Sequence, residues 1–224
     1  MVKLSRIILG MWVLVALGCT FHSTPSGKRT LENPALEVKV TEGFKPLRVN
    51  SVALLPLQTL RVPHVSGALG SALTGKLANA FQVHSSLELV LLSDETSSAF
   101  AKQELTADRE EPSCVKRARI ISPALDVQGI LCAELYRYRD ATGSGMGTED
   151  FAAVGFRLWL LDRGSGRTLW SAAFDKASEP VAKNLLQVRE RLSEGLRFQS
   201  ADQLINEGFL EAALEFEKLR NSTP

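Results

Sequence analysis

The string GSALTGK, from Gly70 to Lys76, comes nearest to catalytic machinery in this sequence. A phosphate-binding loop needs two glycines with four residues between them, then lysine, then a serine or threonine that binds Mg²⁺. Leu77 follows the lysine here, so the magnesium ligand is missing. Leu69, Leu73 and Leu77 also keep the spacing of a helix face straight through the string. We therefore predict a helix that contains two glycines rather than a nucleotide site.

A second glycine-rich string, GSGMG, also lacks the pattern of a catalytic motif. Its residues are Gly143, Ser144, Gly145, Met146 and Gly147. The serine is not flanked as a nucleophile elbow requires, and no predicted helix follows to supply amide donors. Glycine permits the backbone angles of a turn between two strands. We therefore expect a mobile loop tip that offers a contact surface to a partner.

The remaining titratable side chains do not assemble into an active site. The histidines are His22, His64 and His84. His64 and His84 have no Cys, Asp or Glu at the spacing of metal ligands. Glu134, between Cys132 and Tyr136, could be a buried acid, but a surface ion pair with Arg137 or Arg139 is favoured. No two carboxylates make a convincing acid–base pair. The sequence thus predicts a protein that is not an enzyme, with no cofactor and no metal site.

Cys19 is the residue with the clearest chemistry, and that chemistry is lipid attachment. A short basic region precedes an apolar run of 11 residues, 7–17. A membrane span needs roughly 20, whereas a signal peptide has a core of this length. The run ends in Ala16-Leu17-Gly18-Cys19, which resembles the bacterial lipobox. The resemblance implies cleavage after Gly18, diacylglycerol on the Cys19 sulfur, and an acyl chain such as palmitate on the new amino terminus.

The predicted signal peptide, residues 1–18, also indicates where the protein works. Two or three acyl chains exceed the threshold for stable membrane anchoring. Thr20 follows the cysteine, in place of the Asp that holds lipoproteins at the inner membrane. In a Gram-negative source the resemblance implies anchoring in the outer membrane, facing the periplasm. An ordinary secretory signal and an uncleaved membrane helix remain the alternatives.

Composition narrows the class of partner. The formal charge is +1, and loss of Lys3 and Arg6 with the signal takes it to −1. A nearly neutral chain lacks the basic patch that nucleic acid requires. Hydrophobic residues make up 45% of the chain, as is typical of a globular protein. The composition therefore favours a folded domain that binds proteins rather than nucleic acid.

Cys114 and Cys132 are the two cysteines other than the predicted lipidation site. Exported thiols can pair because the periplasm is oxidising. Cys132 lies in a predicted buried strand, and Cys114 lies in the loop or helix before it. Two outcomes stay open: a disulfide, or two thiols that never come within bonding distance.

The hydrophobic pattern predicts a single α/β (α+β) domain over residues 47–220. Residues 19–46 are polar and read as a flexible tether with a reach of roughly 30 Å, although Leu36, Val38 and Val40 alternate as in a strand. Strands are predicted at 49–57, 88–92, 127–138, 151–161 and 167–174. Helices are predicted around 69–81, 95–103, 115–121 and from 180 onward, with Gly208 dividing the last apolar stripe in two. The expected architecture is a mixed sheet of about five strands with a C-terminal hairpin and helices packed on it.

The same hairpin carries Trp159 and Trp170. Large aromatic side chains on a hairpin usually anchor helices on the sheet. A tryptophan that faces solvent would instead be a hot spot for a partner.

Four apolar segments, SVALLPL, GALGSALTGKLANAF, ELVLL and DVQGILCAELYRY, together with the hairpin FRLWLLDRGSGRTLWSAAFD, resemble a group of bacterial envelope lipoproteins. The group includes the amino-terminal-domain-like fold of the Tol translocation protein, the curli-secretion lipoprotein and the peptidoglycan-synthase-activator lipoprotein. The resemblance covers about residues 48–176 and implies a fold rather than a chemistry. Gln128-Gly129 departs from the group's pattern, and no pair of long alternating segments could form a pore, so pore formation is not carried over.

These observations favour a non-enzymatic, lipid-anchored protein that binds or scaffolds protein partners in envelope assembly. The alternative is an accessory subunit of an export or curli-like secretion complex, which would form oligomers. An envelope hydrolase is the least favoured class, because no nucleophile and base can be paired.

Overall fold

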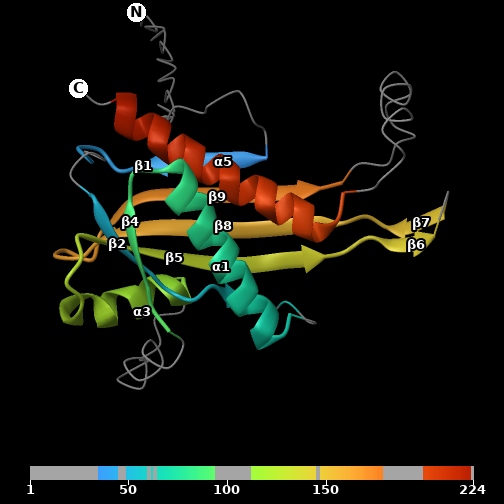
Figure 1. The fold of residues 1–224 in the computed structure, drawn as a ribbon, viewed down its shortest axis with the longest axis horizontal. Coiled ribbons are helices and arrows are strands. Elements are labelled where there is room, and N and C mark those ends of the chain that lie inside the picture. Colours follow the sequence, from blue (N-terminus) through green and yellow to red (C-terminus); the bar gives the residue numbers. More distant parts are fainter. Residues whose placement is uncertain are drawn as a thin grey trace, which may run out of the picture.

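The apolar segments assemble into one mixed sheet with helices on both of its faces (Figure 1). The structure is a computed structural model, and it describes residues 35–44, 49–59, 62, 65–93, 112–144, 147–178 and 199–222. The predicted signal peptide, Gly18 and Cys19 lie outside the described residues. So do the predicted helix at 95–103 and the apolar stripe that begins after residue 180. The α+β class expected from the sequence is confirmed.

The main sheet has seven strands, two more than the sequence predicted. They are β1 (Leu36–Val40), β2 (Ser51–Leu54), β3 (Gln58–Thr59), β4 (Glu88–Leu91), β5 (Gly129–Arg139), β8 (Ala153–Asp162) and β9 (Thr168–Ala177). The order is β1-β9-β8-β5-β2-β4, and β3 pairs with β5 as well. β2 runs parallel to β4 and β5, whereas β5, β8, β9 and β1 are antiparallel. Of the predicted strand at 49–57 the structure has β2, which ends at Leu54 before Pro56, a residue without the N–H that a continuous ladder needs, and β3 follows just beyond the predicted range.

The first strand corrects the predicted tether. β1 pairs with β9 in antiparallel register, from Leu36 opposite Phe174 to Val40 opposite Trp170. The amide of Thr41 extends the ladder by donating to the carbonyl of Leu169 at 2.9 Å. Leu36 is buried because its side chain faces the helix side of the sheet. The folded domain therefore begins by residue 36 and not at residue 47.

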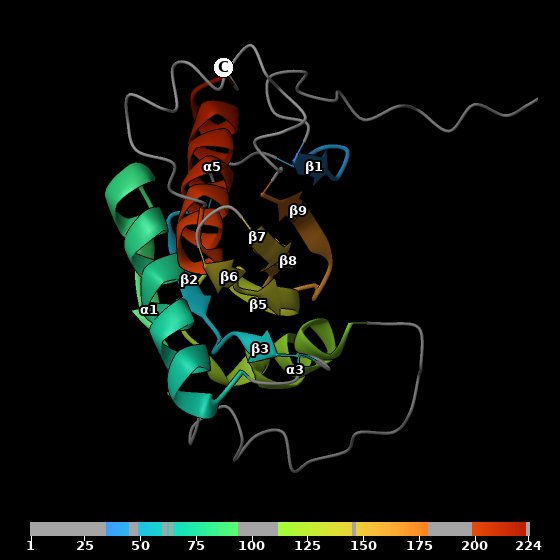
Figure 2. The same cartoon turned by 90° about the vertical axis from the view of Figure 1, so that its right-hand side faces the viewer.

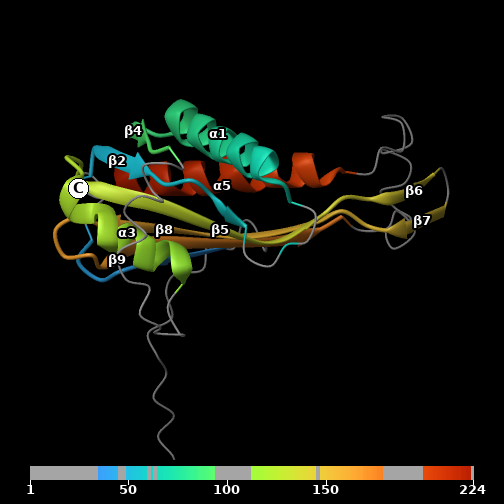
Figure 3. The same ribbon diagram turned by 90° about the horizontal axis from the view of Figure 1, so that it is seen from below.

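Two long helices cover one face of the sheet and a short helix covers part of the other (Figures 2 and 3). α1 spans Gly67–His84 and α5 spans Ala201–Ser222, whereas α3 spans Ser113–Ile121 and leads into the 3-10 turn Ser122–Ala124. The hydroxyl of Ser66 caps α1 by accepting from the amide of Leu69 at 3.2 Å. Leu73, Leu77 and Phe81 of the predicted stripe are fully buried. Among the described residues, no helix is long and apolar enough to cross a membrane.

α5 runs unbroken through Gly208, where the sequence predicted a division into two helices. The glycine lies where the helix backbone comes closest to the aromatic core of the sheet. A Cβ at this position would lie 2.7 Å from the ring of Phe156 and 2.9 Å from that of Phe174. Those two rings stack at 5.1 Å, and Phe209 packs on Phe156 at 4.7 Å. Gly208 therefore permits close packing rather than ending the helix.

The other face carries a smaller core beneath α3. Its buried members include Cys114, Val115, Ala118 and Ile121 of α3, and Ile130 and Cys132 of β5. This core leaves the part of β5 nearest the arm uncovered by α3, which is where Tyr136 is exposed.

Candidate partner-binding surface

A hairpin arm projects from the body of the domain at one end of the sheet (Figures 1 and 3). β5 and β8 lead into β6 (Thr142–Ser144) and β7 (Gly147–Asp150), which form a separate two-stranded sheet. Gly143 pairs with Thr148 and Ser144 with Gly147, while Gly145 and Met146 lie outside the described residues. The predicted loop tip at residues 143–147 is thus largely a paired hairpin. Its glycines indicated a loop, but pairing with the opposite strand satisfies the backbone groups on both sides.

A β-bulge lies in β5 where the arm leaves the domain. The pairing of β5 with β8 shifts register between Leu135 and Arg137, so Tyr136 is the extra residue. A bulge bends a strand and redirects the side chain it inserts. Tyr136 is 38% exposed, in contrast to the buried run of β5 before it. Alternation places Tyr136 on the same face as Cys132 and Glu134, but no sequence pattern shows that α3 ends before it, so Tyr136 was not among the predicted site residues.

Four side chains around this bulge form what we call the Tyr136 cluster: Tyr136, Arg137, Arg157 and Asp175. The single proton of the tyrosine hydroxyl is within reach of two acceptors, the carbonyl oxygen of Phe174 at 3.2 Å and Asp175 Oδ2 at 3.1 Å. The Arg157 guanidinium lies 5.3 Å from the centre of the tyrosine ring, and Arg137 forms an ion pair with Asp175. Partial burial, reinforced by Asp175, raises the pKa of Tyr136 to about 12. The hydroxyl contacts fix the orientation of the ring, and the phenol stays protonated to a higher pH than a free tyrosine.

Gly155 of β8 lies directly against the ring of Tyr136. A Cβ on Gly155 would lie 2.4 Å from the ring of Tyr136, so only glycine lets the ring lie flat against β8. Tyrosine and arginine are enriched at the energetic centres of protein interfaces, because they offer large contact areas with polar ends. The Tyr136 cluster has this composition, and it lies beside the arm on the face that α3 leaves open.

The two tryptophans of the hairpin lie on opposite faces of the sheet. Trp170 is buried and contacts Phe216 of α5 at 5.4 Å and Phe81 of α1 at 6.3 Å between ring centres. It anchors both helices, as predicted. Trp159 is half-buried beside the core under α3. Neither presents a fully exposed ring, so Tyr136 is the better candidate for a partner contact.

Glu134 is buried under α3, which overturns the predicted surface ion pair. Its Oε1 accepts from the amide of Cys114 at 2.9 Å and from the hydroxyl of Ser113 at 3.1 Å. Only 7% of Glu134 is exposed, and Arg137 pairs with Asp175 instead. A carboxylate is favoured here because the first amides of a helix are unpaired and carry partial positive charge. Glu134 therefore caps α3 from a neighbouring strand.

The two cysteines of the domain meet at the same place. The sulfur atoms of Cys114 and Cys132 lie 2.6 Å apart, and both side chains are buried. In this structure they are free thiols.

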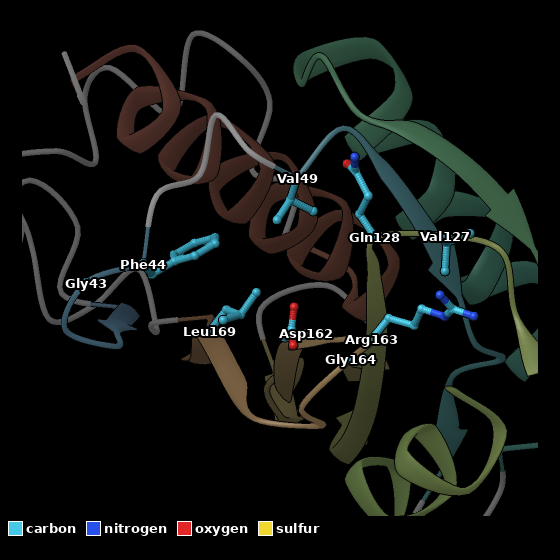
Figure 4. A pocket seen from close by; sticks show the side chains of 9 residues that line it. All are labelled: Gly43, Phe44, Val49, Val127, Gln128, Asp162, Arg163, Gly164 and Leu169. Atoms are coloured by element: carbon cyan, nitrogen blue, oxygen red, sulfur yellow. The ribbon is translucent and has the colours of Figure 1, made fainter. Parts of the chain in front are cut away.

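A cavity of about 530 Å³ lies at the other end of the sheet, by the turn between β8 and β9 (Figure 4). It is lined by Gly43, Phe44, Val49, Val127, Gln128, Asp162, Arg163, Gly164 and Leu169. Gln128 Oε1 accepts from the amide of Asn50 at 2.6 Å, and Asp162 Oδ2 accepts from the amide and hydroxyl of Ser165, both at 2.7 Å. The bonds from Ser165 lower the pKa of Asp162. These polar groups are engaged within the chain, so the cavity chiefly offers apolar contacts.

The structure also places the glycine-lysine string and the histidines that the sequence analysis considered. The string from Gly70 to Lys76 lies inside α1, as predicted, and Lys76 forms an ion pair with Asp202 of α5. His84 ends α1 and is exposed, whereas His22 and His64 lie outside the described residues. Across the described ranges, no group of three His, Cys, Asp or Glu side chains is placed to hold a metal ion.

Comparison with known proteins gives similarity at the level of structure only. No family model matches the sequence, and no curated protein matches it. PelC from Paraburkholderia phytofirmans, a dodecamer, has a TM-score of 0.48 at 11% identity, covering 81% of this chain and 96% of that one. Lipoprotein GNA1162 from Neisseria meningitidis has a TM-score of 0.36 at 16% identity, covering 65% and 96%. The C-terminal domain of LpoB from Salmonella enterica has a TM-score of 0.35 at 17% identity, covering 62% and 88%. The chains similar to this one thus include a bacterial lipoprotein, at low sequence identity.

Proposed function

We propose that this chain is a lipid-anchored protein of the bacterial envelope that works by binding a protein partner rather than by catalysis. The observation that carries the proposal is the hairpin arm with the exposed Tyr136 cluster at its base. The signal-like amino terminus ending at Cys19 supplies the proposed location, facing the periplasm from the outer membrane.

The proposed anchor limits where the domain can act. β1 begins at Leu36, 17 residues after Cys19. A fully extended chain spans at most about 3.6 Å per residue, so the first strand lies within about 60 Å of the lipid. The partner is therefore sought at the membrane or within that distance of it.

The proposed contact runs from the Tyr136 cluster along the arm. Tyr136 offers an apolar ring at a fixed angle, and Arg157 and Asp175 offer both charges beside it. The arm adds the outer backbone groups of β6 and β7, which can pair with an extended segment of a partner. A partner with an exposed apolar side chain flanked by charges of both signs fits this surface.

Photocrosslinking in intact cells tests the proposal. A photoreactive amino acid replaces Thr142 on the arm, and Gln82, on an exposed position of α1, serves as the matched control. We expect a discrete adduct from position 142 that is absent at position 82 and is lost when Tyr136→Ala is added. The same adducts from both positions, or none from the arm, would contradict the proposed contact.

A second candidate function is an accessory subunit of an oligomeric export complex. It is favoured by β4, which ends the strand order of the sheet and exposes Val90 (45%) and Leu91 (53%). Exposed apolar edge strands pair readily with other chains. Light scattering on the full-length protein in detergent measures its oligomeric state. A defined oligomer that Val90→Lys dissociates supports this function, and a monomer contradicts it.

A further inference from the structure

Cys114 and Cys132 stand sulfur to sulfur in the core between α3 and β5. The distance is 2.6 Å, closer than two sulfur atoms approach without a bond and little more than the S–S bond length of about 2.05 Å. Only 1% of Cys114 and 0% of Cys132 is exposed. We propose that these residues form a disulfide in the mature protein, and that it fastens α3 to the sheet.

Hydrogen bonds to the neighbouring Glu134 explain why the two sulfurs meet. Side chains two residues apart on a strand point to the same face, so Cys132 and Glu134 both face α3. Glu134 holds the first turn of α3 through the amide of Cys114 and the hydroxyl of Ser113. Ser113 also bonds to Gln58 of β3, which pairs with β5 beside Glu134. This network fixes the backbone of Cys114 directly above Cys132.

The surroundings indicate a structural cross-link rather than a redox-active pair. Burial raises the pKa of the Cys114 thiol, and the adjoining Cys132 raises it further. The thiolate is the reactive form, and disulfide exchange also requires access to the sulfur. Once α3 lies on the sheet, the thiolate is disfavoured and the sulfur atoms are inaccessible. The bond therefore forms before α3 docks and is then protected by the fold.

The chemistry needs a disulfide-bearing oxidant. Each thiol gives up its proton, the two sulfurs join, and two electrons and two protons pass to the disulfide of a dithiol oxidoreductase, which becomes two thiols. Such oxidants act in the compartment to which the proposed signal would send the chain. The inference rests on the proposed function because the oxidant is met only if the chain is exported.

Peptide mapping provides the test. The full-length chain, expressed in bacteria with its own signal, is quenched with acid and treated with a maleimide in denaturant without reductant. Trypsin then releases Cys114 within residues 110–116 and Cys132 within residues 120–137. We expect these two peptides to be joined, and to separate after reduction. Maleimide on both cysteines, in a chain that begins at Cys19, would overturn the disulfide and leave the proposed export intact.

A second experiment tests the disulfide if the chain is not exported. Retention of residues 1–18 would contradict the proposed function. The same full-length chain, purified in detergent, is then reduced, unfolded in denaturant and refolded with oxidised glutathione, so that both sulfurs are accessible before α3 docks, and this settles whether the disulfide forms. Joined peptides support it, and free or glutathione-capped cysteines overturn it. As a control, reduction should lower the denaturation midpoint of the wild type but leave that of Cys114→Ala/Cys132→Ala unchanged.

Discussion

Replacing Gly208 by alanine should destabilise the protein even though alanine is the better helix former. The new methyl group would lie 2.7 Å and 2.9 Å from two atoms of the Phe156 ring and 2.9 Å from one of Phe174. Both rings are fully buried and stacked on each other, so neither can move without disturbing the core. Gly75 on α1 is the matched control, because a Cβ there meets nothing within 4 Å.

The two substitutions should change stability in opposite directions. Overpacking a filled core costs about 1–3 kcal/mol, and exchanging glycine for alanine in a helix gains about 1 kcal/mol. Three contacts shorter than 3.0 Å with buried rings place the overpacking in the upper part of this range, about 2–3 kcal/mol. Gly208→Ala should therefore lower the free energy of unfolding by about 1–2 kcal/mol after the helix gain of about 1 kcal/mol. Gly75→Ala has only the helix gain and should raise it by about 0.5–1 kcal/mol.

Urea denaturation followed by tryptophan fluorescence measures both values, because Trp170 is buried in the native core. Equal slopes in the two variants would show that the unfolded states are comparable. A Gly208→Ala variant as stable as the wild type would refute the close approach of α5 to the sheet.

Three further outcomes follow from the structure. Gly155→Ala should displace the ring of Tyr136 and reduce partner crosslinking from the arm, at a cost of about 1 kcal/mol because the partly exposed ring can turn toward solvent once its hydroxyl contacts are given up; undiminished crosslinking would contradict the cluster's role. Glu134→Leu should cost about 1–3 kcal/mol in urea denaturation because it leaves the buried amide of Cys114 without its acceptor, whereas exposed Glu88→Ala should change stability by less than about 0.5 kcal/mol. The pKa of Tyr136 is raised from 10.0 to about 12, so its contribution to stability is complete below pH 10 and is lost as pH rises from 10 through 12. The pKa of Tyr138 is raised as well, which acts in the same direction; an absorbance titration of tyrosinate should show a higher midpoint in the native than in the unfolded protein, and equal midpoints would count against it.

The parts of the fold that could be predicted are those fixed by apolar periodicity. The leucines of α1 keep the helix period through a string that resembles a phosphate-binding loop, and burial of that stripe decides the structure. The hairpin of β8 and β9 likewise follows from alternation and a glycine turn. In both cases the signal is local and repeats along the chain.

The parts that were missed depend on contacts between distant segments. The alternation of Leu36, Val38 and Val40 is too short to outweigh the polar composition around it, and β1 is a strand because the edge of β9 is available to pair with it. Glu134 reads as a surface acid until α3 covers it. Tyr136 lies on the same face as Cys132 and Glu134, and it is exposed because α3 covers only the earlier part of β5. The two cysteines could be named as a pair, but their separation is set by how α3 docks.

The mass of the mature amino terminus tests the central claim, that lipid on Cys19 holds this domain at the membrane. The wild-type chain is recovered from bacterial membranes and its first peptide is analysed by mass spectrometry. The account predicts that the chain begins at Cys19 and carries diacylglycerol on the sulfur and an acyl group on the amino nitrogen. A chain that retains residues 1–18, or one that is cut elsewhere and leaves Cys19 without lipid, would contradict it.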